Sequence, residues 1–122
     1  MKTAIILFAH GSRDPQWHAP LQAIRSRIEQ SAPGTPVRCA YLELTEPDLP
    51  GCAQALIGEG ATRLRVMPMF LGMGRHARED LPELIAKLRH SHPEVELEVL
   101  PALGEHPMLV ELTCQIATDK LI

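Results

Sequence analysis

The sequence lacks the features that define several protein classes. Its three cysteines, Cys39, Cys52 and Cys114, are widely spaced and form no Cys-x-x-Cys pair, which favours reduced, mostly buried thiols over a disulfide framework or a zinc knuckle. No segment approaches the roughly 20 apolar residues that span a bilayer. The net charge is −3 and no basic run is interleaved with aromatic residues. We therefore expect a cytoplasmic protein with neither a membrane nor a nucleic acid as its partner.

Familiar catalytic signatures are also missing. The chain has no Walker lysine and no Gly-x-Ser-x-Gly elbow, and Ser12 lies close to His10 without an evident third member of a triad. Gly72-x-Gly74-x-x-Ala77 matches the dinucleotide fingerprint in its letters. However, it follows the third predicted strand instead of the first, and a histidine and two arginines crowd the loop. We do not expect a nicotinamide cofactor.

What is present indicates one α/β domain over residues 1–122. The 122 residues are 45% apolar and 22% charged, as in ordinary globular domains. Four strand-like segments alternate with four helix-like ones, without a linker. The strands are predicted at about residues 2–9, 37–43, 63–70 and 94–100. This alternation predicts a single-domain, doubly wound, mostly parallel four-stranded sheet with helices on both faces. Alternating glutamates in the last strand indicate that it lies at an edge.

The helices are predicted from apolar residues that recur every three or four positions. Asp14-Pro15 supplies an N-cap and a first helical position. The inward face of this first helix is expected to hold Trp17, Leu21, Ile24 and Ile28. Further helices are predicted after residues 45–48, from about residue 78 or 80 to residue 90, and from about residue 107. The inward face of the last helix is expected to hold Leu109, Leu112, Ile116 and Leu121.

Two histidines follow predicted strands that end at the same edge of the sheet. His10 comes directly after an apolar strand, and His76 follows the third strand through a glycine-rich stretch. Ligands bind at this edge in open α/β sheets. Glu43, at the end of the second strand, adds a carboxylate. Two imidazoles and a carboxylate form a candidate site for a divalent metal such as cobalt, nickel, iron or zinc, with positions left open for a substrate.

The alternative for each of these residues is structural. A lone histidine at a strand end is most often a hydrogen-bonded turn residue, and a lone strand-end carboxylate such as Glu43 is most often solvated or caps a helix. The interpretation therefore depends on the coincidence of His10 and His76. His18, His90 and His92 are interpreted as surface residues, whereas His106 stays undecided because Glu105-His106-Pro107 also resembles a helix start.

Three segments resemble the signature regions of the class II tetrapyrrole chelatases, and more narrowly those of the small sirohydrochlorin chelatases. They are residues 8–15 (FAHGSRDP), 42–47 (LELTEP) and 67–82 (MPMFLGMGRHAREDLP), and residues 104–107 fit the last βα turn. The likeness covers essentially the whole chain and implies a chelatase-like fold with flavodoxin-like layering. Many relatives contain two such domains and this chain has one, which implies a homodimer.

The resemblance implies an ATP-independent reaction that inserts a divalent ion into a metal-free tetrapyrrole and releases two protons. His10 and His76 would hold the ion, and Glu43 would assist as a ligand or proton acceptor. One imidazole nitrogen cannot bind a metal and accept a proton at once, so the division of labour stays open. No cofactor is implied beyond the divalent metal substrate, which would be Co²⁺ or, alternatively, Fe²⁺ or Ni²⁺.

The implied substrate, sirohydrochlorin, carries eight carboxylates, whereas the chain is net acidic. Local cations must therefore attract it. Arg13, Arg75 and Arg78 flank the two histidines and are predicted to bind these carboxylates, the alternative being a solvated rim or structural ion pairs. Ser12 and Met73 complete the predicted substrate-binding residues.

We therefore predict a chelatase that inserts cobalt into sirohydrochlorin for cobalamin biosynthesis. Insertion of iron, for sirohaem, or of nickel is the nearest alternative, because His/His/Glu ligation does not choose among these ions. A non-catalytic metal carrier could use the same ligands, although no Cys- or His-rich handover motif occurs. A metal-dependent hydrolase could use the open positions to activate water.

Overall fold

The computed structural model describes residues 2–120 of the chain, and the alternation of strands and helices is as predicted. Two short 3-10 turns, η1 and η2, precede the first and last helices. In chain order the elements are β1 (Thr3–Ala9), η1 (Pro15–His18), α1 (Ala19–Ser31), β2 (Val37–Tyr41), α2 (Leu49–Gly58), β3 (Arg63–Pro68), α3 (Arg75–Ser91), β4 (Glu96–Val99), η2 (Leu103–Glu105) and α4 (Pro107–Ala117).

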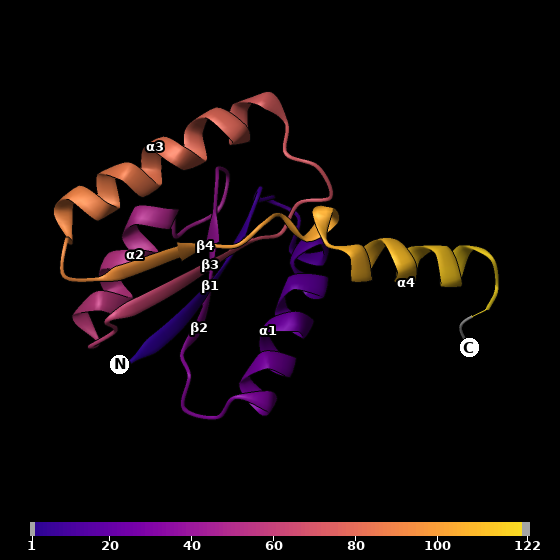
Figure 1. Cartoon of the computed structure of the whole chain (residues 1–122), viewed down its shortest axis with the longest axis horizontal. Helices are drawn as coiled ribbons and strands as arrows, with labels where there is room; N and C mark the ends of the chain where they lie inside the picture. The colour runs from indigo at the N-terminus through magenta and orange to yellow at the C-terminus, as the bar shows by residue number, and fades with distance from the viewer. Residues whose placement is uncertain (1, 121–122) are drawn as a thin grey trace.

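The four strands form one parallel sheet in the order β2-β1-β3-β4. Helices α2 and α3 cover one face of the sheet and α1 lies on the other (Figure 1). These findings confirm the predicted doubly wound α/β fold and the edge position of β4. Because β1 is central and parallel to β2 and β3, the loops that follow these three strands leave the same edge of the sheet.

The central strand β1 is buried on both faces. Ile6 and Phe8 pack into the core shared with α2 and α3, while Leu7 and Ala9 pack on the α1 side. Full burial of an Ile, Leu or Phe side chain stabilises a fold by about 1.5–3 kcal/mol. A continuous apolar run is therefore what this position in the sheet requires, and the rigid strand fixes the starting point of the loop that begins at His10.

The β3–β4 half of the α1 face is ionic. Arg63 and Arg65 of β3 both pair with Glu98 of β4, and the Arg65 Nε–Glu98 Oε2 distance is 3.3 Å. The hydrogen bond from Arg63 lowers the pKa of Glu98 below its ordinary value. Burying charged side chains away from water is unfavourable unless they are paired and hydrogen-bonded. Packing an apolar helix over these residues would therefore not stabilise the fold.

This ionic surface accounts for a wrong prediction about the last helix. No described residue of α4 is buried, and the side chains of Leu112 and Ile116 are 44% and 59% exposed. The helix instead extends away from the body of the domain (Figure 1). Leu121, which was also expected on the inward face, lies outside the described residues.

The start of the first helix also differs from the prediction. Asp14 does cap, but it caps η1, through a bond from the Gln16 N–H to Asp14 Oδ1. Trp17 lies in η1 and is 40% exposed, and Ile24 is 37% exposed, so neither packs inward as expected. Pro20 lies in the first turn of α1 and has no backbone N–H to donate to a preceding helical turn. Residues 15–18 therefore form the separate turn η1 and do not continue α1. Leu21 is buried as predicted.

All three cysteines are free thiols, and the prediction of buried side chains is correct for Cys39 and Cys52. It is wrong for Cys114, which is exposed because α4 is not packed against the domain. Among the helices of residues 2–120, none has both the length and the hydropathy that a membrane crossing requires.

Candidate functional site

His10 and Glu43 meet at the carboxyl edge of the sheet. His10 follows β1 directly, and its Nε2 lies 2.8 Å from Oε1 of Glu43, two residues past the end of β2. The backbone N–H of Glu43 donates to the His10 carbonyl at 3.0 Å, which extends the β1–β2 pairing beyond the strands. Both side chains are about half exposed. The sheet itself therefore brings together an imidazole and a carboxylate that face solvent.

Gly11 makes this approach possible. Its φ of +106° belongs to a conformation that residues with a side chain rarely adopt, and a Cβ placed on it would lie 1.8 Å from the carbonyl oxygen of Glu43. Only a residue without a side chain allows the two backbones to come this close. The glycine of the His10-Gly11-Ser12 turn is therefore required for the His10–Glu43 contact.

A strained turn follows Glu43. The N–H of Thr45 donates to the Glu43 carbonyl at 2.8 Å, and Leu44 between them has a φ of +66°. A leucine rarely adopts this left-handed conformation, and such strain is found most often at functional sites. This turn lets the Glu43 backbone bond to His10 and places the Thr45 side chain against the loop that follows His10.

Thr45 and His18 hold the loop that follows His10. The N–H of Ser12 donates to Thr45 Oγ1 at 3.1 Å, and the Thr45 hydroxyl donates to the Ser12 carbonyl at 2.9 Å. The Nε2–H of His18 donates to the same carbonyl at 2.9 Å, with the ring packed edge-on against Tyr41. His18 is thus half-buried and anchors the loop, and its interpretation as a surface residue is wrong. The sequence carries no local signal for this clamp, because Thr45 lies 33 residues from Ser12 in the chain.

His76 lies on the first turn of α3, and not in a loop, because this helix begins at Arg75 instead of at residue 78 or 80. Its Nε2 lies 2.7 Å from Oδ2 of Asp80, one turn further along the helix, and its side chain is 73% exposed. Asp80 is a functional candidate that the sequence prediction omitted. The spacing of four residues would have indicated it if the helix had been predicted to start earlier.

The site thus consists of two imidazole–carboxylate pairs at one edge of the sheet. Residues 2–120 contain no group of three or more His, Cys, Asp or Glu side chains that could hold a metal ion together. The structure brings His10 and Glu43 into contact but leaves His76 with its own partner. Each pair offers one imidazole nitrogen and one carboxylate oxygen, ligand types that suit borderline divalent ions, and each carboxylate can also accept a proton.

The predicted substrate-binding cations lie on the surface. Arg75 is 84% exposed and its Nε pairs with Glu79 Oε1 at 3.0 Å, while Arg13 and Arg78 are also exposed. All three side chains can therefore reach a ligand in solution. An exposed ion pair such as Arg75–Glu79 contributes little to stability and can be exchanged for a carboxylate of a ligand.

Two further predicted residues have structural contacts. Ser12 Oγ accepts a hydrogen bond from the N–H of Asp14 at 3.0 Å, which stabilises the turn after His10. Met73 is half-buried and packs against the core beneath α2 and α3. The structure thus places Ser12 in the same loop as His10, and Met73 in the loop that leads to His76.

The remaining histidines lie outside this pairing. His106 caps α4, since its Nδ1 accepts a hydrogen bond from the Met108 N–H at 3.1 Å, and this resolves its undecided status. His90 is exposed, as predicted. His92 is half-buried, with Nδ1 3.8 Å from Glu94 Oε1, so the prediction of a surface position is wrong for this residue.

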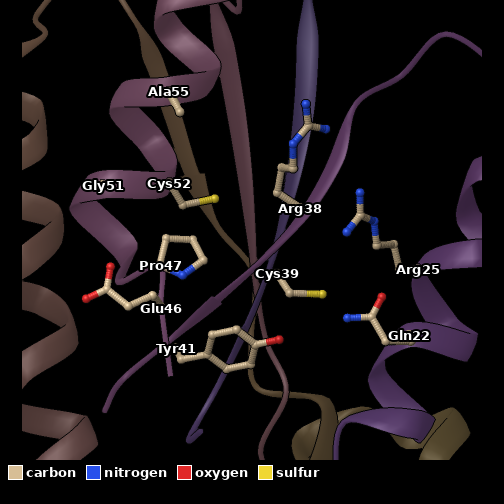
Figure 2. Close-up of a pocket in the computed structure, with 10 residues that line it drawn as sticks. All are labelled: Gln22, Arg25, Arg38, Cys39, Tyr41, Glu46, Pro47, Gly51, Cys52 and Ala55. Carbon is tan, nitrogen blue, oxygen red and sulfur yellow. The ribbon is translucent and has the colours of Figure 1, made fainter. Parts of the chain in front are cut away.

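A separate cavity of about 310 Å³ lies between α1, β2 and α2 (Figure 2). Cys39 and Cys52 line it together with two arginines, and neither His10 nor His76 does. Burial raises the pKa of the Cys52 thiol to about 11 and also raises that of Cys39. Protonated thiols are poor nucleophiles and poor metal ligands, so this cavity does not compete with the histidine edge as a reactive site.

Comparisons with known proteins give a consistent result. The model of the CbiX family matches residues 4–120. The chain is 26% identical to a sirohydrochlorin cobaltochelatase from Methanococcoides burtonii, over 98% of both chains. Its structure superposes on a CbiX protein from Marinobacter aquaeolei with a TM-score of 0.81 and 30% identity, covering 97% and 96% of the two chains. It also superposes on the sirohydrochlorin chelatase SirB from Bacillus subtilis subspecies spizizenii, in complex with cobalt, with a TM-score of 0.80 and 27% identity.

Relatives of two lengths occur among these proteins. The chain spans 51% of the SirB chain, and 41% of a sirohydrochlorin ferrochelatase from Priestia megaterium to which it is 28% identical. By contrast, it spans nearly the whole of the Methanococcoides and Marinobacter proteins. The fold described here is therefore an entire chain in some relatives and about half of the chain in others.

Proposed function

The chain belongs to the CbiX family, and from this membership we propose that it inserts a divalent metal ion, with Co²⁺ favoured, into sirohydrochlorin for cobalamin biosynthesis. A relative that it matches from end to end is named a cobaltochelatase, and the SirB structure contains cobalt. Because the Priestia relative is named a ferrochelatase, Fe²⁺ is the nearest alternative metal substrate, followed by Ni²⁺. The reaction needs no ATP and no resident cofactor, since the metal is itself a substrate.

The observation that carries this proposal is the contact between His10 and Glu43 at the sheet edge where His76 also lies. The 2.8 Å separation of His10 Nε2 and Glu43 Oε1 lets both atoms face one ion or one proton. In the proposed reaction two pyrrole N–H bonds break and two protons leave. The ion exchanges its protein and water ligands for the four nitrogens of the macrocycle, without a change in oxidation state. His10 and His76 hold the incoming ion, and Glu43 acts as a ligand or accepts a proton.

Asp80 has a positioning role in this proposal. A carboxylate that accepts a hydrogen bond from a metal-binding histidine fixes the ring and raises its basicity. Asp80 Oδ2 is close enough to His76 Nε2 to do so, at 2.7 Å, and binding of the ion through the other ring nitrogen would leave this contact intact. Asp80 would then orient His76 without touching the substrate.

Substrate binding depends on the exposed cations in this proposal. Arg13, Arg75 and Arg78 bind carboxylates at the rim of the macrocycle, and Ser12 and Met73 lie in the loops that face it. A homodimer supplies the second half that longer relatives carry in one chain. The three free thiols agree with a cytoplasmic location, where cysteines stay reduced.

The test is a metal-insertion assay with purified protein. Sirohydrochlorin is mixed with Co²⁺, Ni²⁺ or Fe²⁺, and the tetrapyrrole absorption is followed with and without protein, because insertion also occurs spontaneously. We expect multiple turnovers, fastest with Co²⁺. Binding of one metal equivalent without turnover would indicate a carrier instead, and hydrolysis without any effect on the tetrapyrrole would indicate a metal-dependent hydrolase.

A further inference from the structure

Leu44 combines two features that are each unfavourable in the free protein. Its side chain is large and apolar but 52% exposed, and its backbone has a φ of +66°. An isolated exposed leucine is ordinary on a protein surface and by itself indicates nothing. A leucine in the left-handed conformation is rare, because its Cβ crowds the following carbonyl group, whereas glycine and asparagine adopt this conformation more readily. The combination of the two features therefore needs an explanation.

Hydrogen bonds on both sides hold Leu44 in this conformation. The Thr45 N–H donates to the Glu43 carbonyl at 2.8 Å, which closes a strained γ-turn of the left-handed kind around Leu44. The Glu43 N–H donates to the His10 carbonyl at 3.0 Å, and the Thr45 hydroxyl donates to the Ser12 carbonyl at 2.9 Å. The turn is thus fixed to the loop that follows His10, and Leu44 is held beside the metal-binding side chains.

The residues next to the first imidazole–carboxylate pair offer only one large apolar side chain to solvent, that of Leu44. Ala9 and Gly11, on either side of the histidine, are buried. Leu42, which precedes the glutamate, is half-buried and packs against the core beneath α2 and α3. Leu42 therefore serves the fold, whereas Leu44 has no comparable contact with the core.

The substrate ring of the proposed reaction must come close to Leu44. An ion held by Glu43 passes to the four nitrogens at the centre of the macrocycle, and the pyrrole rings extend several ångströms beyond those nitrogens. The Cα atoms of Glu43 and Leu44 are about 3.8 Å apart, since the peptide bond between them is trans. Both side chains are about half exposed. A macrocycle centred on this ion therefore lies within reach of the leucine.

We propose that Leu44 is a substrate-binding residue, which packs against the apolar face of the sirohydrochlorin ring when the ring meets the ion at His10 and Glu43. The inference rests on the proposed function and adds a residue that holds the ring itself, whereas the arginines bind its carboxylates. Burial beneath the ring supplies the apolar contact that Leu44 lacks in the free protein. The backbone strain is then offset only in the complex.

An apolar residue at this position also selects the part of the substrate that meets the ion. The carboxylates at the rim of the macrocycle can themselves bind divalent ions. A carboxylate placed against Leu44 would lose water without gaining a hydrogen bond from this side chain, which is unfavourable. Leu44 therefore favours the nitrogen-bearing centre of the ring beside Glu43, and leaves the rim to the arginines.

The alternative role for Leu44 is within its own loop. A cavity of about 360 Å³ lies among residues 41–48, and Leu44 contributes to its lining. A leucine that shielded this cavity would stabilise the free protein, and its loss would lower the Tm. A leucine that contacts the ring would contribute to substrate affinity instead. The two roles thus predict different effects of the same substitution.

Two substitutions at residue 44 separate these roles. Leu44→Asn removes the apolar surface and suits the left-handed backbone, whereas Leu44→Met keeps the apolar surface and is the matched control. The dissociation constant for metal-free sirohydrochlorin is measured from the fluorescence anisotropy of the tetrapyrrole. We expect it to rise about tenfold in Leu44→Asn, because the apolar contact is lost and an amide without a hydrogen-bond partner meets the ring. In Leu44→Met it should stay within about threefold of the unaltered protein.

Three further measurements distinguish contact with the ring from other effects. The Tm of Leu44→Asn should equal or exceed that of the unaltered protein, because strain is relieved and no buried contact is lost. The dissociation constant for Co²⁺ alone, from isothermal titration calorimetry, should be the same in all three proteins, because His10, Glu43 and His76 are unaltered. The tenfold ratio for sirohydrochlorin should persist in added salt, since salt screens charges and does not weaken an apolar contact.

Four outcomes would overturn the inference about Leu44. Sirohydrochlorin affinity of Leu44→Asn within about threefold of the unaltered protein would show that the ring does not contact this residue. An equal loss in Leu44→Met would assign the effect to the shape of the turn, and a parallel loss of Co²⁺ affinity would assign it to the position of Glu43. A Tm lowered by more than about 4 °C in Leu44→Asn would assign the leucine to the loop cavity.

The same measurements keep this inference separate from the proposed function. If the unaltered protein binds sirohydrochlorin and Leu44→Asn binds it equally well, only the role of Leu44 is wrong. If the unaltered protein does not bind sirohydrochlorin at micromolar concentration, the proposed function is wrong, and the role of Leu44 is wrong with it.

Discussion

The two histidines of the site are held in opposite ways. His10 is held by two residues far away in the sequence, since Glu43 contacts its ring and Thr45 bonds to the Ser12 backbone. The nearer His18 bonds to the Ser12 carbonyl as well. His76 has a carboxylate partner within its own helix, Asp80, and its side chain is the more exposed, at 73% against 52%. One half of the site is therefore built by the tertiary structure, whereas the other depends on local helix geometry.

This difference indicates how the site can accommodate a large planar substrate. The His10 half is preorganised, because moving it would break the contacts of Gly11 and Ser12 with the Glu43–Thr45 turn. The His76 half follows Gly72 and Gly74, where an added Cβ would meet nothing within 4 Å. We expect the β3–α3 loop to adjust to the substrate while the β1–α1 loop stays fixed.

The largest expected effect comes from removing either imidazole. His10→Ala and His76→Ala should each lower kcat/KM for insertion at least about 100-fold, because loss of a ligand exceeds the 10–100-fold typical of an outer contact. Both side chains are more than half exposed, so the Tm should change little. Steady-state kinetics and thermal melts measure the two effects. Activity within about threefold of the unaltered protein would remove that histidine from the mechanism.

The next effect separates the preorganised half from the adjustable one. Gly11→Ala forces a Cβ into the Glu43 carbonyl and should destabilise the fold by about 3 kcal/mol, or lower the Tm by about 10 °C. Gly72→Ala makes the same chemical change in the other loop and should shift the free energy of unfolding by less than about 0.5 kcal/mol. Urea denaturation of the two variants compares them directly. Equal destabilisation would mean that the loops do not differ in rigidity.

These loops also mark the limit of what the sequence could predict. The apolar runs at residues 5–9 and 66–71 predicted the first and third strands, although β3 ends at Pro68 instead of near residue 70. The shared edge of parallel strands then placed His10 near Glu43. The Ser12 clamp was missed because Thr45 lies 33 residues away in the chain, and no local pattern reveals such a hydrogen bond. The predicted helix start at residue 78 or 80 left His76 in a loop, whereas α3 begins at Arg75. Its N-cap is Gly74, which makes no side-chain capping bond, so the sequence carries no capping signal at this position.

The α4 prediction failed for a different physical reason. Helical periodicity identified the apolar side of the helix correctly, but it does not say which surface covers that side. The answer depended on Arg63, Arg65 and Glu98, whose charges occupy the face on which a fourth helix would pack. A strand with arginines at alternate positions beside one with glutamates is the signal that could have excluded this packing.

A smaller effect is expected from residues that act through a histidine. Thr45→Val keeps the shape of the side chain but removes two hydrogen bonds to the Ser12 peptide, and should cost about 1–2 kcal/mol of stability and about tenfold in kcat/KM. Asp80→Asn should lower kcat/KM about as much but leave the Tm nearly unchanged, since exposed ion pairs contribute little to stability. Melts and kinetics on both variants test the contrast. A large loss of stability in Asp80→Asn would show that its role is structural.

The smallest expected effect concerns the exposed cations, which should act on binding and not on chemistry. Arg13→Ala and Arg78→Ala should raise KM for sirohydrochlorin by about three- to tenfold with little change in kcat, because their contacts with carboxylates are alike in the ground and transition states. Arg75→Ala should raise KM less, because Glu79 already pairs with the Arg75 guanidinium. Removing Arg75 also leaves the Glu79 carboxylate unpaired, but its repulsion of the substrate is weak because solvent and salt screen it.

Lys87→Ala is the matched control, because it removes the same charge from the same helix as Arg78, two to three turns further along. Added salt should raise KM for the unaltered protein towards that of the Arg13 variant, since screening over about 8–10 Å weakens the same attraction. If KM responds to Lys87→Ala as strongly as to Arg78→Ala, the net charge of the chain attracts the substrate, and no specific contact at the histidine edge is needed.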